Sequence, residues 1–193
     1  MTKISPEQLA TRCITIAECY AFFRAMFKNP HDHNLIASPD ELISNSKFII
    51  ELSNSLSDRI ILLWCSMFGV DSEDGHWKKL IPINDHESFK KSIQLACFIN
   101  EYEQKVFWDE LTNFRIKYLA HSSIQTSWTH PNIDYCFSTA TLFYNWINKD
   151  DCLTSINPTA PKSLRTVFEE RRLEAKKEIE IGIRFDYEAN KFE

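Results

Sequence analysis

The scarcity of glycine is the strongest constraint on how this chain can fold. Only three of its 193 residues are glycine (Gly69, Gly75 and Gly182), and no two of them are adjacent. Turn-rich β architectures use glycine where the backbone needs a positive φ, so this scarcity favours helices. P-loops and dinucleotide-binding fingerprints need clustered glycines, because the backbone must approach a phosphate closely. The sequence therefore predicts an all-α fold and excludes these two kinds of nucleotide site.

The composition indicates one compact domain with a modest extension. Apolar residues make up 44% of the chain, which is enough to form a buried core. The formal net charge is -5, so any contact with nucleic acid must be local or must be assembled from two protomers. Residues 1–6 are not followed by a long apolar stretch, so we expect no signal peptide. The longest apolar run, Ile60–Cys65, is too short to cross a bilayer, and we expect no membrane contact.

The cysteine and histidine patterns do not indicate a metal or a disulfide framework. No two of the six cysteines form a Cys-x-x-Cys pair, and most have apolar neighbours, so we interpret them as reduced core thiols of a cytoplasmic protein. His31-Asp32-His33 could suggest a metal site, but the other histidines lie in separate segments. Metal ligation needs three or four converging ligands. We therefore interpret residues 31–33 as a polar loop and expect neither a metal nor another cofactor.

Helix start signals and apolar periodicity predict a bundle over residues 1–148. Ser5-Pro6 has the pattern of a helix start, and Asn29-Pro30 predicts the end of that first helix. The same start signal recurs at Ser38-Pro39, and a long helix is expected to run from there to Gly69. Further segments are expected to be one helical turn at 77–80 and helices at about 85–98, 103–123 and 132–148. Five helices joined mainly by short loops predict a five-helix up-and-down bundle.

Residues 149–193 differ in character and are expected to form a C-terminal helical or extended arm. The stretch 149–161 has the composition of a linker, and 162–178 is expected to be a charged helix. From Ile179 to Tyr187 apolar and other residues alternate strictly, which is typical of a strand. Three interpretations stay open: a continuation of the helix, an extended arm, or a strand that pairs with another chain. We favour the arm.

The expected fourth helix ends in a segment that could carry chemistry. Arg115 and His121 have five residues between them, and Ser122-Ser123 follow. This pattern resembles the R-x(4–6)-H signature of the HEPN superfamily, and its context is similar to the arginine-to-"Ala-His" helix end of the abortive-infection subgroup. The second helix, with the acidic loop after it, also resembles that subgroup. The resemblance extends over roughly residues 40–147 and leaves out the C-terminal extension.

The resemblance implies a helical bundle that dimerises and acts as a metal-independent endoribonuclease. It would make Arg115 and His121 the catalytic pair. RNA carries its own nucleophile in the 2′-OH, so the protein must supply only proton transfer and charge stabilisation. Histidine titrates near neutrality and suits the first task, whereas arginine stays cationic and suits the second. The expected product is a 2′,3′-cyclic phosphate.

Ideal helix geometry does not place the two candidate residues on one face. At about 100° per residue, Arg115 and His121 lie about 120° apart. Tyr118 falls between them in angle and Ser122 points nearly the same way as Arg115, so these two are candidate supporting residues. A twofold homodimer with antiparallel fourth helices would bring two copies of the pair into one cleft. RNA and a second copy of the chain are thus the expected partners, with an antitoxin or another protein as a further one.

Two other functions are considered. The first is a non-catalytic HEPN-like domain that dimerises and binds a partner protein through its C-terminal arm. Ile116, at a position commonly polar in active members, and the acidic net charge favour it. The second is a metal-dependent helical hydrolase, which would require the loop at 31–33 to approach His86 or Glu51.

Overall fold

The structure is a computed structural model that describes residues 4–29, 32–35, 47–120, 131–149, 153 and 157–189. Over these residues the fold is all-α, as predicted, apart from one short pair of strands. The α-helices are α1 Pro6–Ala25, α2 Lys47–Phe68, α3 His86–Cys97, α4 Glu101–Phe114, α5 Asp134–Ile147 and α7 Leu164–Ala189. Two single-turn 3₁₀ helices, η1 Trp77–Lys79 and η2 Ile83–Asp85, precede α3. Within the described part of the chain, no helix is long and apolar enough to span a membrane.

Helix α1 begins where the sequence predicts and ends earlier. Ser5 accepts a hydrogen bond from the Gln8 backbone, and the Gln8 side chain caps the Ser5 N–H in return, which confirms the predicted capping box. The helix ends at Ala25 rather than at Asn29-Pro30. The reason is a short antiparallel pair that the sequence did not predict, in which β1 (Phe27–Asn29) bonds to β2 (Asp32–Leu35).

The other boundaries confirm most of the predicted elements. Helix α2 ends at Phe68, just before the predicted stop at Gly69; its expected start at Ser38-Pro39 lies outside the described residues. A Cβ atom on Gly69 would lie 2.5 Å from the carbonyl oxygen of Cys65, so this position requires glycine because of close backbone approach. The turn at 77–80, helix α3 and helix α5 match their predictions to within two residues.

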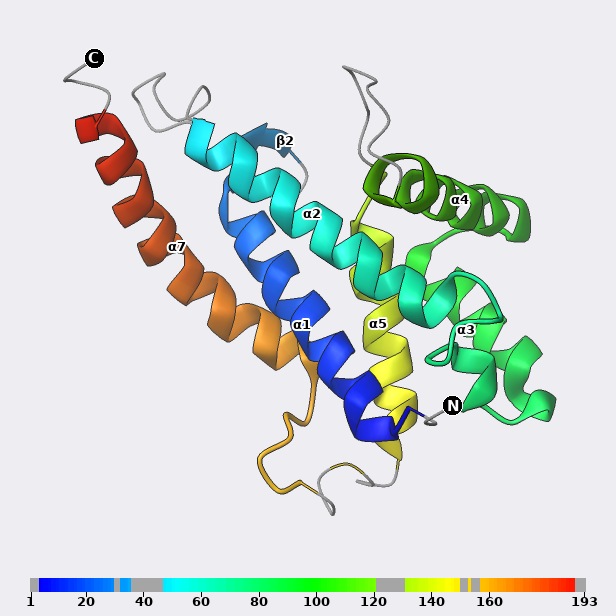
Figure 1. Cartoon of the computed structure of the whole chain (residues 1–193). Coiled ribbons are helices and arrows are strands. Elements are labelled where there is room, and N and C mark those ends of the chain that lie inside the picture. The colour runs from blue at the N-terminus through cyan, green and yellow to red at the C-terminus, as the bar shows by residue number, and fades with distance from the viewer. Residues whose placement is uncertain are drawn as a thin grey trace.

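Of the three interpretations of residues 179–187, the helix continuation is confirmed, because α7 continues as a helix to Ala189; the favoured extended arm and the strand are wrong. Figure 1 shows α7 lying along α1, with α2 on the other side of α1. Ala175 and Ile179, four residues apart, are buried against Met26 and Ile49 in a small apolar cluster formed by α1, α2 and α7. This burial stabilises the helical continuation and leaves no need for a strand partner.

The main core lies between α1, α2, α4 and α5. Its centre is an aromatic cluster in which Trp64 contacts Phe68, Phe107 and Trp108, with ring centroids 4.6–5.4 Å apart. Phe143 of α5 adds an edge contact to Phe68 at 5.4 Å. The cluster fixes the end of α2 against α4, and it therefore positions the segment after α2 beside the candidate site.

The described cysteines are free thiols, as predicted. Cys13, Cys65, Cys97 and Cys136 are buried, and Cys19 is half-buried. Burial raises the pKa of the Cys97 thiol to about 11 and that of Cys65 to about 12. Thiols of this kind are packing groups rather than nucleophiles. Cys152 lies outside the described residues.

Candidate functional site

Arg115 lies at the point where the fourth helix changes from α-helical to π-helical winding. Helix α4 ends at Phe114, and residues Arg115–Ala120 form a π-helix, labelled η3. The Arg115 N–H still bonds to the carbonyls of Leu111 and Thr112, so the change of winding begins at this residue. π-Helical turns are rare, and they are frequently found at functional sites.

The guanidinium of Arg115 is anchored by one carboxylate. Its Nη2 lies 2.7 Å from Oε1 of Glu73, in the acidic connection that follows α2. Both side chains are partly exposed, at 31% for Arg115 and 30% for Glu73. Beneath the pair lies Cys65, whose Sγ contacts the Leu111 carbonyl at 3.7 Å. Arg115 is therefore oriented from below by α2 and α4, and it stays accessible from solvent.

The π-helix changes the expected geometry of the site. The expected separation of about 120° between Arg115 and His121 assumed α-helical winding, whereas bonds from i to i+5 give more residues per turn. Tyr118 lies in the π-helix, and the structure describes its backbone but not its side chain. His121 and Ser122 lie outside the described residues. The structure thus locates Arg115 and the backbone of Tyr118, and the pairing of Arg115 with His121 stays a prediction.

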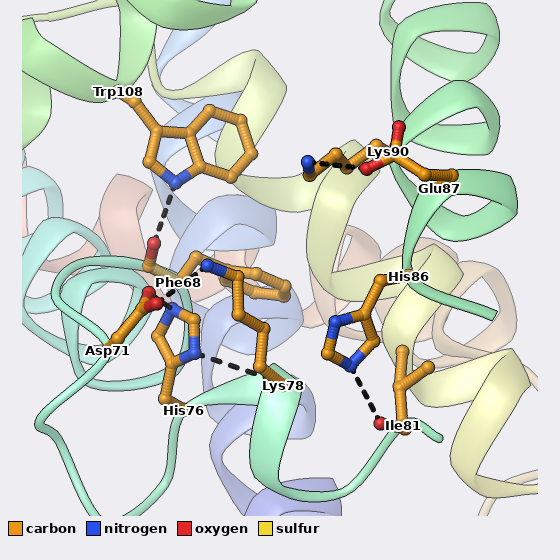
Figure 2. Close-up of polar contacts among 9 residues, drawn as sticks. All are labelled: Phe68, Asp71, His76, Lys78, Ile81, His86, Glu87, Lys90 and Trp108. Carbon is orange, nitrogen blue, oxygen red and sulfur yellow. Dashed lines mark hydrogen bonds and ion pairs between the residues drawn. The ribbon is translucent and has the colours of Figure 1, made fainter. Parts of the chain in front are cut away.

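A cavity of about 290 Å³ is lined in part by the same acidic connection. Its walls come from the end of α2, the segment 71–78, α3 and α4. Trp108 forms one wall, and its Nε1 donates a hydrogen bond of 2.6 Å to the carbonyl of Phe68 (Figure 2). This bond satisfies a carbonyl at the C-terminal end of α2 and fixes the rim of the cavity.

His76 is the buried polar group at the edge of this cavity. Its Nδ1 accepts a hydrogen bond from the Lys78 N–H at 3.4 Å, and its Nε2 lies 3.4 Å from Oδ1 of Asp71 (Figure 2). The residue is only 2% exposed, and burial lowers the pKa of its imidazole to about 4, although Asp71 acts in the opposite direction. His76 is therefore neutral at pH 7, with both ring nitrogens engaged. It holds the loop together and is not placed to transfer protons.

Charged groups of both signs surround the cavity. Lys78 donates to Asp71 Oδ2 at 2.6 Å, and this bond lowers the pKa of the Asp71 carboxyl. Lys90 donates to Glu87 at 2.8 Å, and Lys105 also lines the cavity. The lysines that could bind a phosphate there are partly neutralised by neighbouring carboxylates. The side chains that line the cavity help to hold the loop that carries Glu73. Few of their charges are left unpaired for a ligand.

Sequence reasoning missed the role of His76. The sequence has His76 and His86 in separate segments, whereas both rings contact Trp77, at centroid distances of 5.7 and 4.9 Å. A local signal was present: Asp71 precedes His76 by five residues and Lys78 follows it by two. Nε2 of His86 contacts the Ile81 carbonyl at 2.9 Å, which is a loop-closing role (Figure 2).

The described residues offer no metal site, since no three His, Cys, Asp or Glu side chains among them converge as ligands. His31 lies outside the described residues, and His33 lies in β2 with its side chain undescribed. The hypothesis of a metal-dependent hydrolase therefore stays untested at the loop on which it depends.

Comparison with known proteins gives no family for this chain. No protein-family model matches the sequence, and neither does any characterised protein or solved structure with which it was compared. Any function must therefore be argued from the residues and their geometry.

Proposed function

We propose that this protein is a metal-independent endoribonuclease of the HEPN type, acting in bacterial defence or as the toxin of a toxin–antitoxin pair. The proposal includes the fold of that superfamily, a five-helix up-and-down bundle that works as a homodimer. The observation that supports it best is the position of Arg115: a partly exposed guanidinium where α4 changes to a π-helix, six residues before His121.

The proposed chemistry divides between these two residues. Arg115 offers guanidinium donors to the phosphate as negative charge develops on it in the transition state. His121 moves the proton between the 2′-OH and the leaving 5′ oxygen, and the product is a 2′,3′-cyclic phosphate. Tyr118 and Ser122 would support the substrate from the same segment. No metal is required, because the RNA supplies the nucleophile.

Exposed apolar side chains on α4 and η3 support the proposed dimer. Tyr102, Val106 and Ile116 are exposed at 75%, 38% and 47%, respectively. Positions 102 and 106 are one helical turn apart, and Ile116 lies further along in the π-helix, with the exposed polar residues Asp109 and Asn113 between them. Antiparallel packing of two chains with the twofold axis close to Ile116 would bury this side chain and bring the two Arg115 residues towards one cleft. In this arrangement Ile116 belongs to the dimer interface rather than to the chemistry.

The decisive test is RNA cleavage by the purified protein with a chelator present throughout. The native chain is compared with Arg115→Ala, His121→Ala and the matched control Lys117→Ala, which removes an exposed cation two residues from Arg115. We expect the first two variants to lose at least about a hundredfold in rate, the order of magnitude of one transition-state contact or one proton-transfer group. The control should retain activity.

Two further measurements complete this test. Circular dichroism checks that each variant is folded, and detection of a 2′,3′-cyclic phosphate identifies the mechanism. Equal activity in the native chain, Arg115→Ala and His121→Ala would refute the proposal. A native chain that cuts no RNA under any condition in which it is a dimer would also count against it.

The second candidate is a non-catalytic HEPN-like domain that binds a partner protein. One observation favours it: helix α7 carries large apolar side chains that remain exposed, Leu173 at 63% and Ile181 at 54%. Exposed apolar side chains on a terminal helix could bind a partner helix such as part of an antitoxin. Loss of partner binding in Leu173→Glu, with no RNA cleavage by the native chain, would support this candidate over the nuclease.

A further inference from the structure

A second and larger cavity shares no lining residue with α4 or with the segment that carries Arg115. Its volume is about 540 Å³, within the usual range for small-molecule sites. Helices α1, α5 and α7 form its walls, with one residue from the end of α3. The nuclease proposal assigns no role to this cavity.

Four cationic side chains line this cavity, and three of them come from one face of α7. Arg165, Arg172 and Lys176 repeat at helical spacing over eleven residues, or about 16 Å of helix. Arg24 of α1 faces them, with a side chain that is only 9% exposed. A buried guanidinium in a cavity wall is costly unless it serves packing or a ligand.

The carboxylates near the cavity do not match the number of cations. Arg24 Nη1 lies 3.5 Å from Oδ1 of Asp134, and Arg172 Nε lies 3.7 Å from Oε2 of Glu169. Among the described residues, Arg165 and Lys176 form no ion pair. Among the described side chains, four cations against two carboxylates leave two excess positive charges at the cavity of a protein whose net charge is -5.

One donor in the wall is both buried and unsatisfied. The Nε atom of Arg172 is buried and has no hydrogen-bond partner in the part of the chain that the structure describes. The contact with Glu169 is too long for a hydrogen bond. Unsatisfied donors of this kind are rare in native proteins. The Nε atom itself is covered, so a ligand would reach Arg172 through the rest of its side chain, which is 31% exposed.

Aromatic rings form the apolar part of the same wall. Tyr20 stacks on Phe137 at a centroid distance of 4.7 Å, and Phe168 lies 5.2 Å from Phe137. Arg172 lies over the Phe168 ring and Arg24 over the Tyr20 ring, each at 5.9 Å. The wall thus combines planar apolar surface with guanidinium groups held at its edge.

We propose that this cavity binds a small organic phosphate, with its phosphate on the α7 cations and its flat apolar body on the rings of Tyr20, Phe137 and Phe168. A phosphate dianion matches the two excess charges, and arginine forks bind phosphate oxygens in pairs. The aromatic surface provides a place for an attached ring or apolar group. A carboxylate would leave one of the excess charges unmatched.

A small molecule fits this site better than an RNA strand. A long polyanion would have to extend beyond the cavity over an acidic protein, and Glu170, Glu174 and Glu178 are exposed on α7. A small phosphate requires positive charge only at the cavity itself. The site is therefore independent of the nuclease proposal and could regulate the protein or serve another activity.

The experiment is a binding titration of the full chain with 1-naphthyl phosphate, inorganic phosphate and 1-naphthol. The double variant Arg172→Gln/Lys176→Gln is compared with Arg171→Gln/Lys177→Gln, which makes the same charge change one residue earlier and one residue later, outside the cavity. Lys176→Gln alone serves as a milder variant, because Lys176 is exposed and its loss should not disturb folding.

We expect the native chain to bind naphthyl phosphate at least about tenfold more tightly than either phosphate or naphthol alone. The cavity double variant should lose about tenfold or more in affinity, as expected for lost charge-assisted contacts. The matched control should lose less than about twofold. Equal losses in both double variants, or no binding by the native chain, would overturn the proposal. So would a single-stranded oligoribonucleotide that binds more tightly than naphthyl phosphate and loses affinity in the cavity variants, since that would identify a strand-binding groove.

Discussion

Arg115 and Glu73 form an ion pair, with Nη2 of the arginine 2.7 Å from Oε1 of the glutamate. The pair joins the C-terminal end of α4 to the acidic segment between α2 and η1. It orients the guanidinium, and it also occupies donors that a substrate phosphate would use. Under the proposed function, Glu73 therefore competes with RNA for Arg115.

The first prediction follows from this competition. Glu73→Gln keeps the shape of the side chain and removes its charge, so we expect faster RNA cleavage at low substrate concentration. The gain should be up to about fivefold, because an exposed ion pair is worth about 0.2–1 kcal/mol. The measurement is kcat/KM for a short RNA substrate, with denaturation in urea as a check of stability.

Asp74→Asn is the matched control for this prediction. It makes the same charge change in the neighbouring residue, whose carboxylate lies 3.8 Å from Lys79 instead of near Arg115. We expect little change in kcat/KM for this variant. A decrease in kcat/KM in Glu73→Gln alone would mean that Glu73 positions Arg115 for catalysis rather than competing for it.

The second prediction concerns the C-terminal helix. In α7, Ile179 is 3% exposed and Ile181 is 54% exposed, whereas in a strand the two side chains would lie on the same face. Ile179→Ala should lower the free energy of unfolding by about 2–4 kcal/mol, because it leaves a cavity against Met26 and Ile49. Ile181→Ala should change it by less than about 0.5 kcal/mol. Similar losses in both variants, measured by urea denaturation, would contradict the helical assignment.

This C-terminal segment shows why part of the fold could not be predicted from sequence. The alternation from Ile179 to Tyr187 is a genuine strand pattern, but local periodicity carries no information about what surrounds it. Helices α1 and α2 bury Ala175 and Ile179, a pair with helical spacing, and this packing outweighs the local pattern. The helix starts were predictable because caps such as Ser5 with Gln8 depend on a few neighbouring residues.

The candidate site was predictable in part for the same reason. Arg115 was identified from a short local motif, and it lies at the end of α4; His121, the other residue of the motif, lies outside the described residues. Its partner Glu73 comes from another element, and sequence reasoning did not pair the two residues. The π-helix was missed because the angular argument assumed α-helical winding, and nothing local to residues 115–120 indicates the change.

The third prediction concerns the hydrogen bond between α4 and the end of α2. Nε1 of Trp108 donates a hydrogen bond of 2.6 Å to the Phe68 carbonyl. Trp108→Phe removes this donor and keeps most of the aromatic surface. We expect a loss of about 1–2 kcal/mol in the free energy of unfolding. Trp146→Phe is the control, because Trp146 packs partly buried on the same core and donates no hydrogen bond within the described residues. If both variants lose the same stability, the hydrogen bond contributes nothing beyond packing.

The fourth prediction is a pH dependence of stability that originates at His76. Burial lowers the pKa of this imidazole to about 4 in the folded protein, whereas in the unfolded chain it is about 6.5. Between these values the unfolded state binds more protons than the folded state, so stability rises with pH. The contribution of His76 to the free energy of unfolding is thus fully present above about pH 6.5 and is lost as the pH falls towards 4. It amounts to at most about 3 kcal/mol.

His76→Asn isolates this contribution, because asparagine can still accept the hydrogen bond from the Lys78 N–H but does not titrate. The difference in free energy of unfolding between the native chain and the variant should shrink as the pH falls from 6.5 to 4. The Asp71 carboxyl contributes little to this pH dependence. Its usual pKa already lies below pH 4, and the hydrogen bond from Lys78 lowers that pKa further. A difference that stays constant over the range would show that His76 is as accessible to protons in the folded state as in the unfolded one. In that case the imidazole would not be a buried, neutral group that bridges Asp71 and the Lys78 N–H. It would then not hold the loop that carries Glu73 in the way described above.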